Sequence, residues 1–185
     1  MLTAAVFAVL IALGFHLRNI MREKEQPPAQ LTEDQIKQRW RELGFFCELD
    51  DQKRIWTLTG SRAGLLYFPD LLLGYVNDPA NATDGDHKEY GPYGSLEIMT
   101  WHDAGFDSKA IRGSLTALTH LAELVEVKLA TAEPGTPISI REEFAPESRY
   151  TLLLDVRADG FDPASTDRER LGATTTNLPS KGRDK

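Results

Sequence analysis

The chain has 185 residues, with 21 lysines and arginines against 28 aspartates and glutamates, and a formal net charge of −7. Segments 1–25 and 165–185 are slightly basic, which leaves a net charge of −10 on residues 26–164. Such an excess of carboxylates repels nucleic acid and attracts basic proteins, so the expected partner is a basic protein and not a nucleic acid. The competing explanation is that the charge serves solubility alone. The single cysteine, Cys47, excludes an internal disulfide and a cysteine-based zinc site, and we expect it to be buried in a strand.

An uncharged apolar run occupies residues 2–15, and Arg18, Arg22 and Lys24 follow it. A helix of this run would be about 21 Å long, so it spans a hydrocarbon core of about 30 Å only if it continues with Arg18 reaching the headgroups. A cleaved signal peptide would need basic residues before the run and small residues after it. A buried core helix fits the apolarity of the run but not its position before a charged linker that contains prolines. The pattern favours a single-pass anchor at 1–22. Its basic flank predicts an outward N-terminus and a domain in the cytoplasm, at a bacterial inner membrane.

A linker with two adjacent prolines at 23–31 precedes the first predicted helix, which begins after the N-cap Thr32 and ends at Gly44. Its apolar residues recur at the spacing of one helix face: Ile36, Trp40 and Leu43. Segments 45–49 and 54–60 are rich in aromatic and β-branched residues and predict a β-hairpin.

Residues 61–76 are ambiguous, because their leucines suit a helix that Pro69 would interrupt; we expect a helical turn that begins at Pro69. The composition of 77–94 predicts a long loop, and long loops are often either functional or disordered. The alternation of apolar and polar residues at 95–101 predicts a strand.

The clearest helical pattern begins at a cap, Asp107 or Ser108, and continues to Leu129 with a period of 3.6 residues. Segments 137–144 and 149–158 predict two further strands. This order of elements predicts an α+β fold, in which helices pack on one face of a mainly antiparallel sheet. The domain would cover 32–164, and the polar segment 165–185 is expected to be a disordered tail.

No nucleophile elbow, phosphate-binding loop, dinucleotide fingerprint or HExxH zinc motif occurs, so the sequence predicts no catalytic residue, metal ligand or cofactor. Aromatic and acidic residues in and after the long loop instead predict a surface that binds a partner. Tyrosine and tryptophan on loops are large binding anchors, and carboxylates add negative potential. The predicted residues are Asp84, Asp86, Glu89, Tyr90, Tyr93, Trp101, His102 and Asp103. The competing interpretation is that the aromatic residues cap the core.

Two histidines allow a second hypothesis for the same region. If the loop folds back, His87 and His102 could gather with Asp84, Asp86 and Asp103, which are residue types of metal and acid–base sites. The spacing does not require this, and a solvated loop explains the same residues.

The absence of catalytic motifs, the acidic domain and the anchor together favour a non-catalytic protein-binding module tethered to a membrane. Its sharpest form is an acidic immunity protein that blocks the basic active site of a bacterial toxin. Two alternatives stay open. One is a small membrane-tethered hydrolase that uses His102 with Asp103 or Glu97, and the other is an accessory or scaffold subunit of a cell-envelope complex.

Overall fold

A computed structural model of the chain describes residues 31–167. The predicted anchor at 1–22, the linker as far as residue 30 and the predicted tail beyond Asp167 lie outside the described residues. Among residues 31–167, no helix combines the length and the apolarity that crossing a membrane requires.

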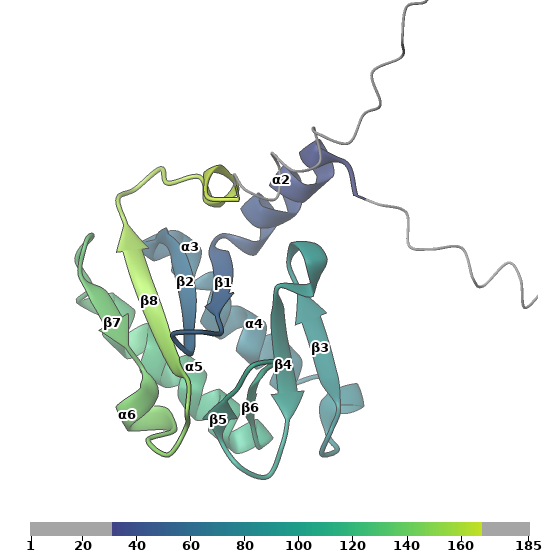
Figure 1. The fold of residues 1–185 in the computed structure, drawn as a ribbon. Helices are drawn as coiled ribbons and strands as arrows, with labels where there is room; N and C mark the ends of the chain where they lie inside the picture. Colours follow the sequence, from purple (N-terminus) through teal and green to yellow (C-terminus); the bar gives the residue numbers. More distant parts are fainter. Residues whose placement is uncertain (1–30, 168–185) are drawn as a thin grey trace, which may run out of the picture. The chain divides into compact units, whose positions relative to one another are not determined.

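The strands of the described region form two four-stranded sheets, which Figure 1 shows in one view. In each sheet the central pair of strands is parallel and the two outer pairs are antiparallel. The α+β class is confirmed. The prediction of one mainly antiparallel sheet is wrong in its number of sheets, and both sheets are mixed.

The first sheet has the order β1–β2–β8–β7. Its strands are β1 (Phe46–Asp50), β2 (Ile55–Ser61), β8 (Thr151–Arg157) and β7 (Pro137–Ser139). The predicted hairpin is confirmed, because β1 and β2 pair in antiparallel register. Trp56 and Leu58 of β2 lie opposite two leucines of β8, Leu152 and Leu154, and all four are buried. They therefore form the core face of this sheet.

The second sheet has the order β3–β4–β6–β5. Its strands are β3 (His87–Tyr90), β4 (Leu96–Thr100), β6 (Ile111–Gly113) and β5 (Gly105–Phe106). Leu96, Ile98 and Ile111 are fully buried, whereas their neighbours in the strands, such as Met99 and Arg112, are half-buried. Because successive side chains of a strand point to opposite faces, Arg112 lies on the outer face of the sheet.

The helices at 67–76 and 115–130 lie on one side of the strands, behind them in the view of Figure 1, whereas the helix at 33–43 lies at the top of that view. The helices are α2 (Glu33–Leu43), α3 (Arg62–Leu65), α4 (Tyr67–Val76), α5 (Leu115–Ala130) and α6 (Arg141–Phe144). Single 3-10 turns complete the elements: η1 (Pro79–Asn81), η2 (Pro92–Gly94) and η3 (Pro163–Ser165). Helices α4 and α5 contact each other extensively, and α5 buries Leu118, Leu121 and Leu129. Each leucine buried in this way contributes about 1.5–3 kcal/mol relative to an exposed one.

The predicted start of the long helix at Asp107 or Ser108 is wrong. Helix α5 begins at Leu115, and Ser114 is its cap, with Oγ accepting a hydrogen bond from Ala117 N (3.1 Å). Asp107 instead forms a turn, because its Oδ1 accepts from Lys109 N (2.8 Å) and Ala110 N (3.0 Å). Ile111 is buried in β6 and not in the helix, so its match to the 3.6-residue period of α5 is a coincidence.

Two other predicted segments are shorter or more structured than expected. The predicted strand at 137–144 ends at Ser139, and Arg141–Phe144 is a helix instead. The change from strand to helix occurs at the buried Ile140, whose backbone is helical. The predicted loop at 77–94 contains β3, η1 and η2. The strand predicted at 149–158 is confirmed as β8.

The first helix agrees with its prediction. It begins directly after Thr32, and Gly44 ends it with a positive φ of 84° while its N–H donates to Trp40 O (3.1 Å). Pro69, however, is the third residue of α4 and not the first. A helix tolerates proline there because its first four N–H groups have no partner within the helix.

Candidate functional site

A buried polar network fixes the inner side of the loop between α4 and β3. The Tyr75 hydroxyl donates to Asp86 O (2.7 Å) and accepts from Thr100 N (2.9 Å). Thr100 Oγ1 donates to Asn81 O (2.6 Å), and Asn81 Nδ2 donates to Tyr75 O (2.9 Å). The hydroxyl hydrogens of Tyr75 and Thr100 are therefore both used in hydrogen bonds to backbone carbonyls. Burial raises the pKa of Tyr75, although its contacts with Thr100 lower it. The network ties the loop to α4 and to the end of β4.

Four of the predicted residues come together on the outer side of the same loop. His102 Nδ1 lies 3.3 Å from Asp84 Oδ2, and His102 Nε2 lies 3.2 Å from Asp103 Oδ2. The Trp101 ring centroid is 5.0 Å from that of His102. We call Asp84, Trp101, His102 and Asp103 the His102 cluster. Its polar side chains are open to solvent, with 61% of His102 and 74% of Asp103 exposed.

The backbone explains why Asp84 reaches His102. Gly85 N donates to Thr100 O (2.9 Å), and Thr100 N also donates to Asp86 O (2.9 Å). Two residues of the loop thus face Thr100, which is the arrangement of a β-bulge. Asp86 uses its side chain to close the turn, because Oδ2 accepts from Thr83 N (2.7 Å). The folding back of the loop that the second hypothesis required is therefore present.

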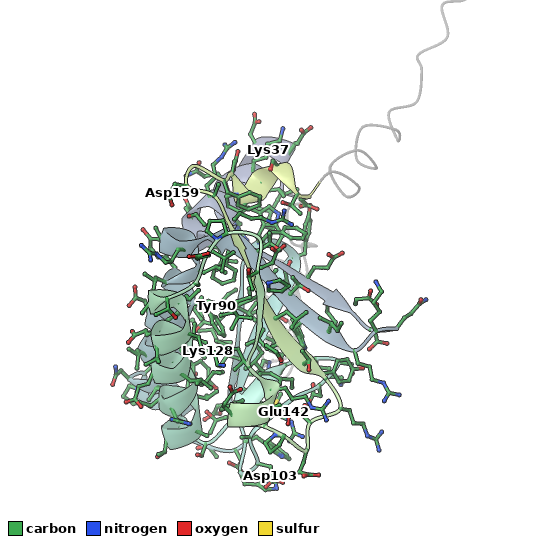
Figure 2. All side chains as sticks on the ribbon, turned by 90° about the vertical axis from the view of Figure 1, so that its left-hand side faces the viewer. Lys37, Tyr90, Asp103, Lys128, Glu142 and Asp159 are labelled. Carbon is green, nitrogen blue, oxygen red and sulfur yellow. The ribbon has the colours of Figure 1, made fainter. Side chains whose placement is uncertain are left out.

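Of the other predicted residues, Asp86 lies at the same end of the β3–β4 pair as the His102 cluster, because its carbonyl accepts from Thr100 N. Glu89, Tyr90 and Tyr93 lie towards the other end. Tyr90 pairs with Leu96 at the start of β4, whereas the His102 cluster follows the end of that strand. Figure 2 shows Tyr90 well separated from Asp103. Tyr93 is 47% exposed and has a positive φ of 61°. The eight predicted residues therefore divide into two groups and do not form one patch.

The Tyr90 end has its own electrostatic features. Burial, followed by the nearby Tyr75 and Asp78, raises the pKa of Tyr90 to about 12. Lys88 Nζ lies 5.7 Å from the centroid of the Tyr90 ring, within the range of a cation–π contact. Glu89 lies opposite Glu97 across the two strands, a pairing of like charges that costs stability.

The second histidine does not join the His102 cluster. His87 Nδ1 lies 3.1 Å from Gly85 O, and His87 is exposed. Within residues 31–167, no three His, Cys, Asp or Glu side chains are arranged to hold a metal ion. His120 is exposed on α5, where Nδ1 lies 3.9 Å from Glu123 Oε2.

A pocket of about 710 Å³ adjoins the cluster, and Asp103 is part of its lining. It lies between the β5–β6 segment and the residues that follow α6, and Arg112 of β6 contributes to its wall. Sequence patterns do not reveal this pocket, because its walls come from two widely separated segments, 103–112 and 144–150. The only local signal was Arg112 itself, a charged residue between the apolar Ile111 and Gly113 in a short strand.

The hydroxyl groups beside the pocket are used by the fold. Ser148 Oγ donates to Phe106 O (2.6 Å) and accepts from Phe106 N (3.0 Å), and the Tyr150 hydroxyl donates to Asp51. In the described part of the chain, neither nitrogen of His102 contacts a hydroxyl or a thiol. Nucleophilic catalysis needs a nucleophile beside its base, and residues 31–167 place none beside His102.

Comparisons with protein-family models, curated proteins and solved structures found no match.

Proposed function

We propose that this chain is a non-catalytic protein-binding module, that its N-terminal segment tethers it to a membrane, and that its partner is a basic protein. The observation that carries the proposal is the His102 cluster, in which the exposed side chains of Asp84, His102 and Asp103 lie beside the half-buried Trp101. A buried network holds the loop that carries Asp84. A surface held in one conformation loses little entropy on binding, which favours affinity.

The charge distribution supports a basic partner. Residues 84–103 contain five carboxylates and one lysine. The carboxylates are Asp84, Asp86, Glu89, Glu97 and Asp103, and the lysine is Lys88. An acidic surface of this kind accelerates association with a basic protein, and the acceleration decreases as salt concentration rises. The sharpest form of the proposal is an immunity protein that covers the basic active site of a bacterial toxin, from the cytoplasmic side of the inner membrane.

The test is capture of the partner from detergent-solubilised native cells, with a tag placed after Lys185. The double variant Asp84→Asn, Asp103→Asn removes two charges from the cluster with little change in shape. We expect it to recover much less of a basic soluble partner than the unaltered chain. Asp159→Asn is the matched control, because Asp159 is an exposed aspartate at the opposite end of the view in Figure 2.

Two results would contradict the proposal. Equal recovery by the double variant and the control would remove the cluster from the interface. Recovery of a set of integral membrane proteins would instead favour a scaffold subunit of an envelope complex.

The alternative of a small hydrolase rests on one observation, the His102 imidazole held between two carboxylates at 3.3 and 3.2 Å. Carboxylates can orient a histidine that transfers protons. The variant His102→Ala separates the two functions: a hydrolase would lose its activity, whereas a binding module without catalytic activity would have none to lose.

A further inference from the structure

Arg112 differs from the other arginines that form ion pairs or side-chain hydrogen bonds in the described region. Arg41, Arg141 and Arg157 each donate a hydrogen bond through Nη2, to Asp162, Pro146 O and Asp155 respectively, and Arg62 donates through Nη1 to Ala130 O. Neither terminal nitrogen of Arg112 donates to any described residue. Its side chain is 28% exposed, and the open part lines the pocket. The pocket therefore contains a guanidinium whose terminal N–H groups have no partner in the described region.

The inner nitrogen of this guanidinium is also unsatisfied. Arg112 Nε forms an ion pair with Asp107, with 3.1 Å between Nε and Oδ2, but the contact is not a hydrogen bond. Nε is nevertheless buried. A buried donor without a partner is rare in folded proteins and requires an explanation.

The surroundings hold Arg112 in place. Asp107 is fixed by hydrogen bonds, because its Oδ1 accepts from the backbone N–H groups of Lys109 and Ala110. Its backbone carbonyl accepts from Trp56 Nε1 (2.8 Å). Gly105 lies beneath the guanidinium, where a Cβ would be only 3.3 Å from Arg112 Nε. The charge is therefore positioned before any ligand arrives, which lowers the cost of binding.

The charges of the pocket restrict the ligand. Its lining contains Asp103, Asp107 and Glu147 against Arg112 and Arg149, a net charge of −1. A dianion such as phosphate would be repelled by the carboxylates. A single carboxylate matches the planar fork of the guanidinium, and positive groups beside it would satisfy Asp103 and Glu147.

We propose that the pocket receives a carboxylate side chain of the protein partner, and that basic residues flank this carboxylate. The proposal rests on the proposed function, because it names the chemical group by which the basic partner is recognised. The His102 cluster and the pocket would then form one continuous interface, since Asp103 belongs to both.

The test uses the full-length chain in detergent, labelled with ¹⁵N, and follows the Nε–H signal of Arg112 by NMR. The probes are two peptides, acetyl-Lys-Glu-Lys-amide and acetyl-Lys-Gln-Lys-amide, and inorganic phosphate, all at matched ionic strength. We expect the glutamate peptide to shift the signal saturably at millimolar concentrations. The glutamine peptide should bind at least about tenfold more weakly, because it lacks the charge-assisted hydrogen bonds.

Variants provide the controls. Arg112→Gln should abolish the response of nearby backbone signals to the glutamate peptide, and Arg112→Lys should weaken it while retaining the charge. The two peptides also test the unaltered chain, so the proposal stays testable if Arg112→Gln does not fold. Arg157→Gln, an exposed arginine outside the pocket, should leave the response unchanged.

Three results would overturn the carboxylate pocket: no saturable shift, equal binding of both peptides, or phosphate binding as tightly as the glutamate peptide. The proposed function would be unaffected if the Arg112→Gln variant still captured the partner from cells. Loss of capture by the double variant of the His102 cluster, with no effect of Arg112→Gln, would restrict the interface to the cluster alone.

Discussion

The loop between α4 and β3 has two sides that use polar residues in opposite ways. On the inner side, the side chains of Tyr75, Asn81 and Thr100 are buried and form hydrogen bonds with backbone groups. On the outer side, Asp84 and His102 are mostly exposed and meet only at 3.3 Å. The difference indicates that stability depends on the inner side, whereas the outer side is available for recognition.

The largest effect on stability is expected from Tyr75→Phe. The variant removes a hydroxyl that donates to Asp86 O and accepts from Thr100 N, inside the buried network. The free energy of unfolding should fall by about 2 kcal/mol, on the scale of buried polar groups that lose a partner. Urea denaturation of the full-length chain measures this change. An unchanged midpoint would show that the network does not hold the loop.

A smaller loss is expected from Thr100→Val, which keeps the shape of the side chain. Thr100 Oγ1 donates to Asn81 O (2.6 Å), so valine leaves that carbonyl without this donor. The expected loss is about 1 kcal/mol, the typical net contribution of one hydrogen bond. A loss larger than that of Tyr75→Phe would mean that Thr100, and not Tyr75, is the centre of the network.

Alkaline pH should destabilise the folded domain through Tyr75 and Tyr90. Burial raises the pKa of Tyr75 and raises that of Tyr90 to about 12, from a usual value of 10. The folded chain therefore retains these protons longer than the unfolded chain does. The stabilisation is complete below about pH 10 and is lost as pH rises towards 12, so the free energy of unfolding should fall across that range. Denaturation at several pH values measures this slope, and Tyr90→Phe should make it shallower.

The smallest effect on stability is expected on the outer side, from Asp84→Asn. The contact with His102 is exposed, and exposed ion pairs contribute little because solvent screens them. The free energy of unfolding should change by less than about 0.5 kcal/mol, while partner capture decreases. A loss comparable to that of Tyr75→Phe would show that the His102 cluster is a structural feature.

Local patterns were sufficient to predict much of the fold. The first helix, the hairpin of β1 and β2, and the strands β4 and β8 follow from periodicity and turn residues. The arrangement into two sheets could not be predicted in this way, because the parallel pairs β2–β8 and β4–β6 join segments that no local signal relates. Asp107 shows a second limit, since the same side chain can cap a helix or close a turn.

The candidate site was predicted only in part, because local composition indicates a surface but not which distant segments meet there. Asp84 and His102 are 18 residues apart, and the composition of the loop between them indicated a surface. The Arg112 pocket joins the β5–β6 segment to Ser148 and its neighbours, and only the tertiary fold relates these segments. The eight predicted residues divide into two groups because β3 separates the two ends of this segment. The composition of the segment predicted a loop and gave no sign of this strand.

The buried thiol of Cys47 is a natural probe of how often the first sheet opens. It is the only cysteine in the sequence, it is 3% exposed in β1, and its Sγ lies 3.5 Å from Ser95 O. A thiol reagent can reach this sulfur only when β1 separates from its surroundings. The labelling rate of the unaltered chain therefore reports how often the first sheet opens, with no engineered probe. A partner that binds the folded domain and suppresses opening would slow this reaction, so the same cysteine can report binding at a distant surface.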